Sequence, residues 1–310
     1  MFSRVLLAVL LGWMFSTLGR AQVGVPVAAP HRPFPAIERV CIISIDGLRP
    51  DRALIADMPN LRALLKSGTY TFWARTTPNA ITLPSHVSML TGVSPRQHGV
   101  EWNRDLPLSE PVYPLVPTIF EMAKRVGYST AVVAGKSKFA IFDKPGALSY
   151  VEIAKSATSS NADVLTAAVR LIEEHQPQLL FVHFPEVDNT GHAKGWGSPE
   201  QLAAIERTDT QLGELFAAMD RAGIRKSTFI IVTSDHGGSG LSHGPDDPRS
   251  RYIPWIASGP GVREHFDLTQ MANLEVNTED TAATACYLLG LRLPPNFEGK
   301  PVLAAFETLP

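Results

Sequence analysis

Four short runs of apolar, often β-branched residues constrain the fold of this chain more than any other feature of its sequence. They cover residues 39–45, 129–134, 179–184 and 228–233. Near-continuous apolar character over such a length is typical of strands buried on both faces of a parallel sheet. Stretches with helical periodicity lie between the runs, at 118–125, 161–175 and 199–221. Strands that alternate with helices predict an α/β fold with a central, mostly parallel β-sheet sandwiched between helices.

The composition fits a single domain of this kind. The chain has 310 residues, of which 45% are hydrophobic and 19% charged, so it can bury a substantial core. We therefore expect one domain across residues 37–310. A formal net charge of -2, without a basic run, gives no electrostatic reason to expect a nucleic-acid backbone as the main partner.

The N-terminal segment differs from the rest of the chain. Arg4 precedes an apolar stretch from Val5 to Leu18, and small residues follow around Ala21. This pattern predicts a signal peptide over residues 1–21, and hence a periplasmic or secreted protein with no stable membrane span after cleavage. The alternative is an uncleaved membrane anchor, although the apolar stretch is shorter than the ~20 residues that a spanning helix needs.

Residues 22–36 form a second kind of segment, which is rich in proline. The four prolines in it favour an extended tether over a helix or a strand. We expect the folded domain to begin near Ile37.

Two cysteines, Cys41 and Cys286, are present. Cys41 lies within the first apolar run, where a small buried side chain is the usual reason for a cysteine. A disulfide framework is therefore not expected. A single bond between the two stays open, because separation along the sequence does not determine their geometry.

Carboxylates and histidines follow three of the four predicted strands. They are Asp46 after the first run, Asp188 and His192 after the third, and Asp235, His236 and His243 after the fourth. Because open parallel sheets bind ligands at the carboxyl ends of their strands, we expect these side chains to meet. Asp188 and His192 are four residues apart, which places both on one side of a helical turn or in one compact loop.

This mixture of imidazole and carboxylate groups indicates a metal site. It suits zinc, iron or manganese better than calcium or magnesium, and three protein ligands per ion would leave a position open for substrate. An aspartate at a strand end is also a common helix cap, and a lone histidine is often only hydrogen-bonded. For Asp46 alone the capping role is the stronger interpretation, whereas the three titratable groups among glycines after the fourth run favour function.

The segment from Thr82 to Gly92 predicts a helix with a hydroxyl group at its start. Pro84 suits the first turn of this helix and Gly92 suits its end. Thr82 would lie at or beside the N-cap, where the helix dipole and a bound metal ion could stabilise an alkoxide for attack on phosphorus. N-capping is the alternative role for this threonine, and Ser85 or Ser88 could compete as the nucleophile.

Five segments of the chain form a specific combination. They are Ile45-Asp46-Gly47-Leu48-Arg49, Thr82-Leu83-Pro84-Ser85-His86, Pro95-Arg96-Gln97-His98-Gly99-Val100, Val187-Asp188-Asn189-Thr190-Gly191-His192 and Ser234-Asp235-His236-Gly237. From about Val40 onward, the chain resembles the alkaline phosphatase superfamily, and within it the type I phosphodiesterase and nucleotide pyrophosphatase branch.

The resemblance implies an alkaline phosphatase-like catalytic domain that holds two divalent metal ions, with zinc as the expected metal. The residues implied around one ion are Asp46, Thr82, Asp235 and His236, and those around the other are Asp188, His192 and His243. Thr82 is then the nucleophile of a double displacement through a phosphothreonine, and Asn103 donates to a phosphoryl oxygen. The implied partner is a small phosphate-ester substrate.

Two alternatives to phosphodiester hydrolysis stay open. Lys136 follows the second apolar run, and a lysine that reaches the phosphoryl group would complement the extra charge of a phosphomonoester. A solvated basic loop is the competing interpretation of this lysine. The other alternative is a different class of protein, either a transferase of phosphoryl-linked groups or a metal-dependent binder of phosphorylated ligands.

Overall fold

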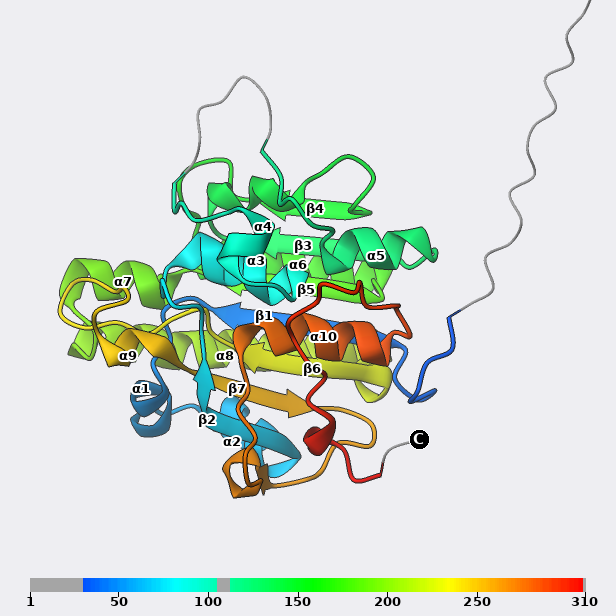
Figure 1. Cartoon of the computed structure of the whole chain (residues 1–310). Coiled ribbons are helices and arrows are strands. Elements are labelled where there is room, and N and C mark those ends of the chain that lie inside the picture. Colours follow the sequence, from blue (N-terminus) through cyan, green and yellow to red (C-terminus); the bar gives the residue numbers. More distant parts are fainter. Residues whose placement is uncertain (1–29, 105–111, 309–310) are drawn as a thin grey trace, which may run out of the picture.

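The central feature is one sheet, seen here in a computed structural model that describes residues 30–104 and 112–308. Within these residues the sheet has eight strands in the order β4-β3-β5-β1-β6-β7-β2-β8 (Figure 1). The strands are β1 (Arg39–Ile45), β2 (Gly68–Arg75), β3 (Thr130–Ala134), β4 (Tyr150–Ile153), β5 (Leu179–Phe184), β6 (Thr228–Thr233), β7 (Tyr252–Ser258) and β8 (Phe266–Asp267). The neighbours from β4 to β6 are parallel, and β7 is antiparallel to both β6 and β2. The predicted, mostly parallel sheet is confirmed.

Helices cover both faces of this sheet (Figure 1). One face carries α3, α5 and α10, and the other carries α1, α2, α6 and α8, as two separate clusters of buried hydrophobic residues show. The helices are α1 (Pro50–Ile55), α2 (Pro59–Lys66), α3 (Thr82–Thr91), α4 (Pro95–His98), α5 (Ile119–Arg125), α6 (Asn161–His175), α7 (Glu186–Lys194), α8 (Pro199–Arg221), α9 (Pro248–Arg251) and α10 (Thr278–Leu288). The predicted sandwich of a sheet between helices is therefore also confirmed.

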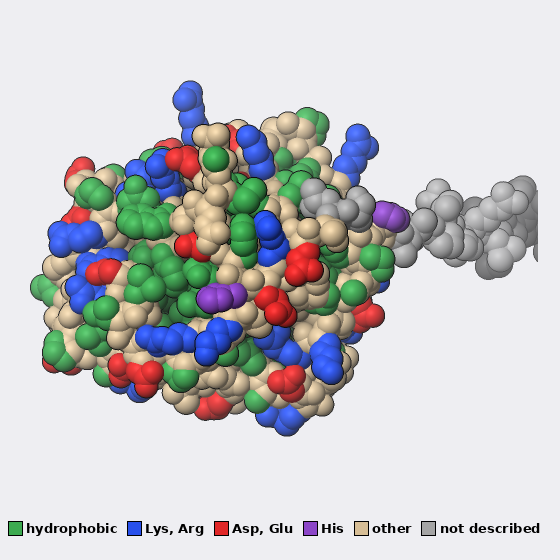
Figure 2. Space-filling model, turned by 90° about the horizontal axis from the view of Figure 1, so that it is seen from below, with side chains coloured by type: hydrophobic (Ala, Val, Ile, Leu, Met, Phe, Trp, Pro, Cys, Tyr) green, Lys and Arg blue, Asp and Glu red, His purple; other side chains and the backbone are tan. Residues whose placement is uncertain are grey.

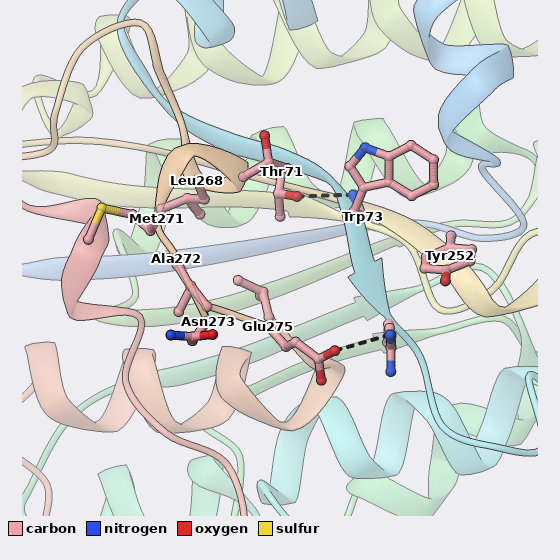
Figure 3. A pocket seen from close by; sticks show the side chains of 12 residues that line it. Thr71, Trp73, Tyr252, Leu268, Met271, Ala272, Asn273 and Glu275 are labelled. Atoms are coloured by element: carbon pink, nitrogen blue, oxygen red, sulfur yellow. Dashed lines mark hydrogen bonds and ion pairs between the residues drawn. The ribbon is translucent and has the colours of Figure 1, made fainter.

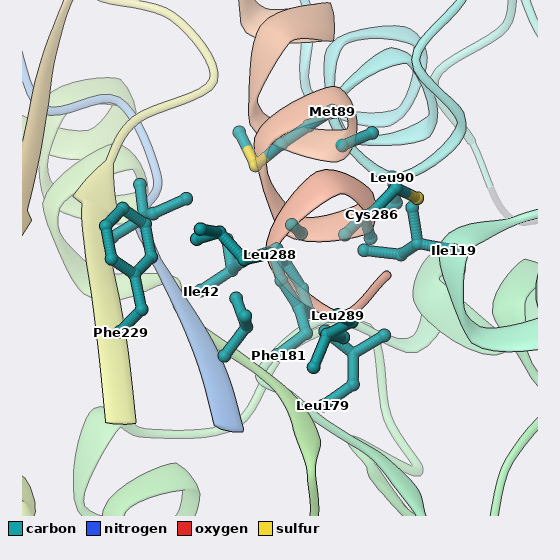
Figure 4. Close-up of a cluster of buried hydrophobic side chains, with 14 of the residues drawn as sticks. Ile42, Met89, Leu90, Ile119, Leu179, Phe181, Phe229, Cys286, Leu288 and Leu289 are labelled. Atoms are coloured by element: carbon teal, nitrogen blue, oxygen red, sulfur yellow. The ribbon is translucent and has the colours of Figure 1, made fainter. Parts of the chain in front are cut away.

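Strand β1 shows why its sequence is apolar throughout. Alternate residues of a strand point to opposite faces, and Ile42 packs in the cluster under α3 and α10, whereas Ile43 packs in the cluster under α6 and α8. Figure 4 shows the first cluster, where Ile42 lies with side chains from β5, β6, α3 and α10. Both cysteines are free and buried, and they belong to different clusters: Cys41 to the second and Cys286 to the first. The two thiols thus lie on opposite faces of the sheet, so they do not pair.

The antiparallel edge of the sheet was not predicted from the sequence. Strand β7 contains Pro254, which cannot donate a backbone hydrogen bond and argues against a strand. The pairing of β2 with β7 shifts register between Thr71 and Ala74, opposite Ile253 and Trp255. Pro254 therefore lies where the ladder is already irregular, and such irregularities tolerate proline.

The packed part of the chain begins slightly before Ile37. The ring of Phe34 stacks on that of Phe306 with centroids 4.4 Å apart, and Arg32 donates a hydrogen bond to the carbonyl of Ile37. The predicted signal peptide over residues 1–21 and the first part of the predicted tether lie outside the described residues. In the part of the chain that the structure describes, every helix is too short or too polar to cross a bilayer.

Gly92 ends α3, as the sequence predicts, and this position gives a stability test. Gly92 has a φ of +72°, and a Cβ at this position would come within 2.0 Å of the ring of Phe297. We expect Gly92→Ala to lower the free energy of unfolding by about 2 kcal/mol or more, since the left-handed conformation alone costs an alanine ~1–2 kcal/mol. Urea unfolding measures this change.

Gly127 offers a matched control for Gly92. It follows α5 with a φ of +89°, and a Cβ there would meet no described atom within 4 Å. Gly127→Ala should therefore show only the conformational cost. Equal losses in the two variants would mean that the Phe297 contact adds nothing.

Candidate active site

The carboxyl ends of the parallel strands lie together at one end of the sheet, beside α7 (Figure 1). Asp46 directly follows β1, Lys136 follows β3, Asp188 lies on α7 just after β5, and Asp235 follows β6. All four side chains are buried. The structure thus brings together the polar residues that the sequence placed after separate strands.

Three carboxylates converge here with unpaired oxygens. Among the described residues, Oδ1 of Asp46, Oδ1 of Asp188 and Oδ2 of Asp235 are buried and have no hydrogen-bond partner. Nε2 of His236 lies 3.4, 3.9 and 3.2 Å from these three oxygens, respectively. Burial of a carboxylate oxygen without a partner costs free energy, and one divalent cation can compensate several such oxygens at once. The donor set therefore fits a metal ion.

Three histidines present the same ring atom to this cluster. His192, His236 and His243 each donate Nδ1–H to a backbone carbonyl at 2.8–2.9 Å; these carbonyls belong to Leu241, Gly237 and Ala80, respectively. That hydrogen bond fixes the tautomer and leaves the lone pair on Nε2, as in metal-binding histidines. Burial lowers the pKa of His236 to about 4 and also lowers that of His243, so both rings are neutral at pH 7.

The candidate ligands form two overlapping groups. One contains Asp188, His192 and His243, and the other contains Asp46, Asp188 and His236, each with its ligand atoms within 4.8 Å of one another. Nε2 of His192 and Nε2 of His243 lie 3.4 and 3.7 Å from Oδ1 of Asp188. Asp188 and His192 thus lie on the same side of α7, as their spacing in the sequence predicts. Asp188 is in reach of both groups, whereas the sequence resemblance assigned it to one.

Gly47 allows the strand ends to approach this closely. Its φ is +73°, and a Cβ on it would lie 3.0 Å from Cα and Cβ of Asp188. Its N–H donates to Oδ1 of Asp235 at 3.1 Å, which leaves Oδ2 of that carboxylate facing the cluster. The turn after β1 therefore orients the carboxylate of Asp235 and leaves room for Asp188 to lie close to it.

Thr82 lies at the first position of α3, with Ile81 as the N-cap residue. The structure therefore excludes the N-cap role for Thr82. Its buried Oγ1 is 3.3 Å from Nε2 of His236, which can only accept in the tautomer described above. The competing hydroxyls are bonded elsewhere, Ser85 to Thr76 and Thr77, and Ser88 to His98.

Lys136 connects the two groups of candidate ligands. Its Nζ lies 2.8 Å from Oδ2 of Asp46 and 2.6 Å from Oδ2 of Asp188. Burial alone would lower the pKa of Lys136, but these two carboxylates raise it above its usual value, so the ammonium is charged. Burial and the neighbouring Asp46 and Asp188 raise the pKa of Asp235. Asp46 and Asp188 together carry one more charge than the ammonium of Lys136, and this excess of negative charge favours cations.

A cavity of about 360 Å³ opens beside Thr82 and the candidate ligands. Asn103 lines it, and its Oδ1 accepts hydrogen bonds from the N–H of Leu83 and from Lys138. Arg104, Lys136 and Lys138 also line the cavity. Six of the predicted site residues thus line this cavity, whereas Asp46, Asp235 and His236 do not, and three basic side chains contribute to its wall.

Sequence reasoning assigned no role to two histidines that touch this cluster, His86 and His183. Nδ1 of His86 lies 3.4 Å from Oδ2 of Asp235. His183 lies inside β5, and its Nε2 is 2.8 Å from Oδ2 of Asp46. The available signal was a lone histidine in an otherwise apolar strand, one residue before the strand ends.

Other hollows of the surface differ from this site in their chemistry. The pocket in Figure 3, of about 390 Å³, lies along β2, and its charged pair Arg75 and Glu275 is satisfied internally. An apolar pocket of about 250 Å³ beside it includes Leu54, Trp73 and Tyr252. On this edge of the molecule, charges of both signs alternate around recessed hydrophobic side chains (Figure 2). The titratable cluster lies apart from both pockets.

The mixed sheet between helices and the cluster of carboxylates and histidines at the carboxyl ends of its strands define an α/β protein with an alkaline phosphatase-like fold and a candidate metal centre. The chain belongs to the type I phosphodiesterase / nucleotide pyrophosphatase family, whose model matches residues 40–254.

Known relatives and solved structures agree with this placement. The chain is 27% identical over 216 residues to an uncharacterized pyrophosphatase/phosphodiesterase of Schizosaccharomyces pombe, covering 64% of this chain and 44% of that protein. It is 26% identical over 249 residues to human ectonucleotide pyrophosphatase/phosphodiesterase family member 7, covering 74% and 53%. The chain spans about half the length of these curated relatives.

A solved structure of murine ectonucleotide pyrophosphatase / phosphodiesterase 5 superposes with a TM-score of 0.71 at 18% identity. The match covers 87% of this chain and 100% of that one. An inactive threonine-to-alanine variant of the murine protein is in complex with AMP.

Proposed function

We propose that this protein is a two-metal hydrolase of phosphate esters, of the phosphodiesterase type, with Thr82 as its nucleophile. One observation carries the proposal: three unpaired carboxylate oxygens and three Nε2 lone pairs converge beside the hydroxyl of Thr82 in the described chain. The family of the chain supports the same reaction class. The catalytic unit is the single domain over residues 37–310.

The proposed ligands divide into two sets that meet at Thr82 and Asp188. Asp46, Thr82, Asp235 and His236 would hold the first ion, and Asp188, His192 and His243 would hold the second. The imidazole and carboxylate donors suit zinc in both sites. Two bound ions would supply charge neutralisation for the attacking and leaving oxygens and acidify the attacking hydroxyl.

The remaining steps belong to residues of the chain. Thr82 Oγ attacks phosphorus and loses its proton, while the bond to the leaving alkoxide breaks and that alkoxide takes up a proton from solvent. A water then cleaves the phosphothreonine and supplies the proton that restores the hydroxyl. Because Oδ1 of Asn103 is engaged by the N–H of Leu83, its NH₂ group is left to donate to a phosphoryl oxygen.

The likeness to nucleotide-directed relatives supports a nucleotide or a similar phosphate ester as substrate. Murine ectonucleotide pyrophosphatase / phosphodiesterase 5 binds AMP in its inactive threonine-to-alanine form. The apolar segment before Ala21 supports a periplasmic or secreted location for the protein, where such a substrate would be met outside the cytoplasm.

A second candidate function is phosphomonoester hydrolysis, which the basic wall of the cavity favours. Lys136 lies where the two ligand groups meet, so its ammonium is close to any phosphoryl group that binds both ions. A monoester carries one more negative charge than a diester, and a charged hydrogen bond is worth ~1.5–3 kcal/mol.

The comparison of bis-p-nitrophenyl phosphate with p-nitrophenyl phosphate tests both functions. We expect kcat/KM to be at least about 10-fold higher for the diester. Lys136→Ala should lower kcat/KM for the monoester about 10-fold more than for the diester, because only the monoester needs the extra positive charge. Steady-state kinetics of the purified, zinc-supplemented protein measure both effects.

Lys144 provides the matched control for Lys136. It is a partly exposed lysine that pairs with Glu121 away from the cavity, so Lys144→Ala should leave both rates unchanged. A monoester rate above the diester rate would replace the first function with the second. Inactivity toward both esters, with transfer of the phosphoryl-linked group to a lipid or alcohol acceptor, would indicate a transferase.

A further inference from the structure

His183 occupies a buried position under the proposed metal site. It is the register partner of Ser44 in the pairing of β1 with β5, so both side chains point to the face that α3 covers. Its side chain is fully buried, and Phe139 packs against its ring at 4.3 Å between centroids. A polar ring held this tightly in an apolar layer must satisfy both of its nitrogens.

The hydrogen bonds of His183 determine which nitrogen carries the proton. The N–H of Gly135 donates to the carbonyl of His183 at 3.2 Å and also lies 3.3 Å from Nδ1, and a backbone N–H can only donate. Nδ1 is therefore the acceptor, and the proton is on Nε2. Nε2–H then donates to Oδ2 of Asp46 at 2.8 Å. This tautomer is the opposite of that in His192, His236 and His243, so His183 has no Nε2 lone pair to offer a metal ion.

The contact with His183 decides which oxygen of Asp46 faces the cluster. Oδ2 accepts from His183 and from Lys136, both at 2.8 Å. Oδ1 is the oxygen without a partner among residues 30–104 and 112–308, and it lies 3.4 Å from Nε2 of His236. Rotation of the carboxylate would break the bond to His183. The ring thus holds the carboxylate in one orientation.

We propose that His183 is a positioning residue that holds Oδ2 of Asp46 and thereby presents Oδ1 as a single metal-binding oxygen. The inference rests on the proposed two-metal function and names a residue that acts on it through Asp46. Partners of ligating groups in general change metal affinity by about 10–100-fold when they are removed.

Two substitutions of His183 distinguish the effects of the hydrogen bonds that its two ring nitrogens make. The amide nitrogen of glutamine reaches about as far as Nε2, so His183→Gln can keep the donor to Asp46. The side chain of asparagine reaches only about as far as Nδ1, so His183→Asn can keep the contact with Gly135 but not with Asp46. We expect zinc affinity of one of the two ions to fall by about 10-fold or more in His183→Asn and by less than about 3-fold in His183→Gln.

Zinc affinity is measured by competition with a chromophoric chelator, and kinetics give a second readout. In His183→Asn, kcat should fall at limiting zinc and recover at excess zinc, with KM little changed, because Asp46 binds no substrate. His98→Asn is the matched control: His98 is also buried, bonds Ser88 through Nε2 and accepts from Val100 at Nδ1. It should lose stability but keep its zinc affinity.

The possible outcomes separate the role of His183 from the proposed two-metal function on which it rests. A wild-type protein that binds no zinc would overturn the proposed function. A wild-type protein with two zinc ions, and with unchanged affinity in both His183 variants, would overturn the role of His183 alone. Loss in His183→Gln but not in His183→Asn would assign importance to the Gly135 contact, and would likewise overturn the role in orienting Asp46.

Discussion

Thr82→Ala is expected to lower kcat/KM for a phosphodiester by about 10⁴-fold or more, because the variant lacks the oxygen that forms the proposed covalent intermediate. The hydroxyl lies at the start of α3 and 3.3 Å from Nε2 of His236, inside the proposed ligand cluster. Asp46, Asp235 and His236 would still hold the metal ion. Zinc content, measured by elemental analysis, should therefore stay close to two per chain.

The expected intermediate gives a direct check on this nucleophile. Acid quenching during turnover, followed by mass spectrometry, should find a phosphoryl adduct on the peptide that contains Thr82 in the wild-type protein and none in Thr82→Ala. Thr91, at the other end of the same helix, is a control: its Oγ1 donates to the carbonyl of Val87, and Thr91→Ala should retain activity. Full activity in Thr82→Ala would exclude this residue as the nucleophile.

Strands β1, β3, β5 and β6 could be predicted from the sequence because local pattern and tertiary environment agree there. The fifth parallel strand, β4, was missed, and its residues are only partly buried. Strands such as β1 and β6 are buried on both faces, so burial requires the unbroken apolar runs that the sequence displays. Strand β7 was missed because Pro254 is acceptable only next to the register shift in β2, which depends on a neighbour some 180 residues away in the chain. Non-local pairing of this kind leaves no local signal.

The candidate site also contains some features that could be predicted from the sequence and others that could not. Residues after strand ends, such as Asp46 and Asp235, could be predicted because strand direction alone brings them to one edge. Asp188 belongs to both groups of candidate ligands because of its place on α7. The proposed role of His183 depends on Asp46, which follows the neighbouring strand β1. Neither follows from spacing. The N-cap interpretation of Thr82 also needed the structure, since one residue decides between Ile81 and Thr82 as the cap.

Charge explains why these residues form a site and not merely a buried network. Burial of Asp46 and Asp188 beside the ammonium of Lys136 leaves a net negative charge among side chains with little exposure to water. Removal of charges from water is unfavourable unless opposite charge compensates them. The cluster is therefore destabilising to the folded chain until cations are present, which links metal binding to stability as well as to catalysis.

Metal removal is accordingly expected to have two large effects. Dialysis against a strong chelator should reduce diester hydrolysis below detection, because the proposed mechanism has no side chain that could replace the ions at Thr82. It should also lower the melting temperature. Zinc at about 1,000 times its Kd would stabilise the folded state by ~4 kcal/mol, since it binds the folded chain and not the unfolded one. Differential scanning calorimetry and activity assays, before and after zinc is restored, measure both.

Asp188 allows the metal effect to be assigned to this cluster and not to sites elsewhere on the surface. It belongs to both groups of candidate ligands, so Asp188→Asn should weaken binding of both ions and abolish most of the zinc-dependent rise in melting temperature. Asp163 caps α6 at the surface together with Ser160, and Asp163→Asn should keep the full rise. A zinc response that survives Asp188→Asn would place the stabilising metal outside the proposed site, because no other described carboxylate belongs to both groups.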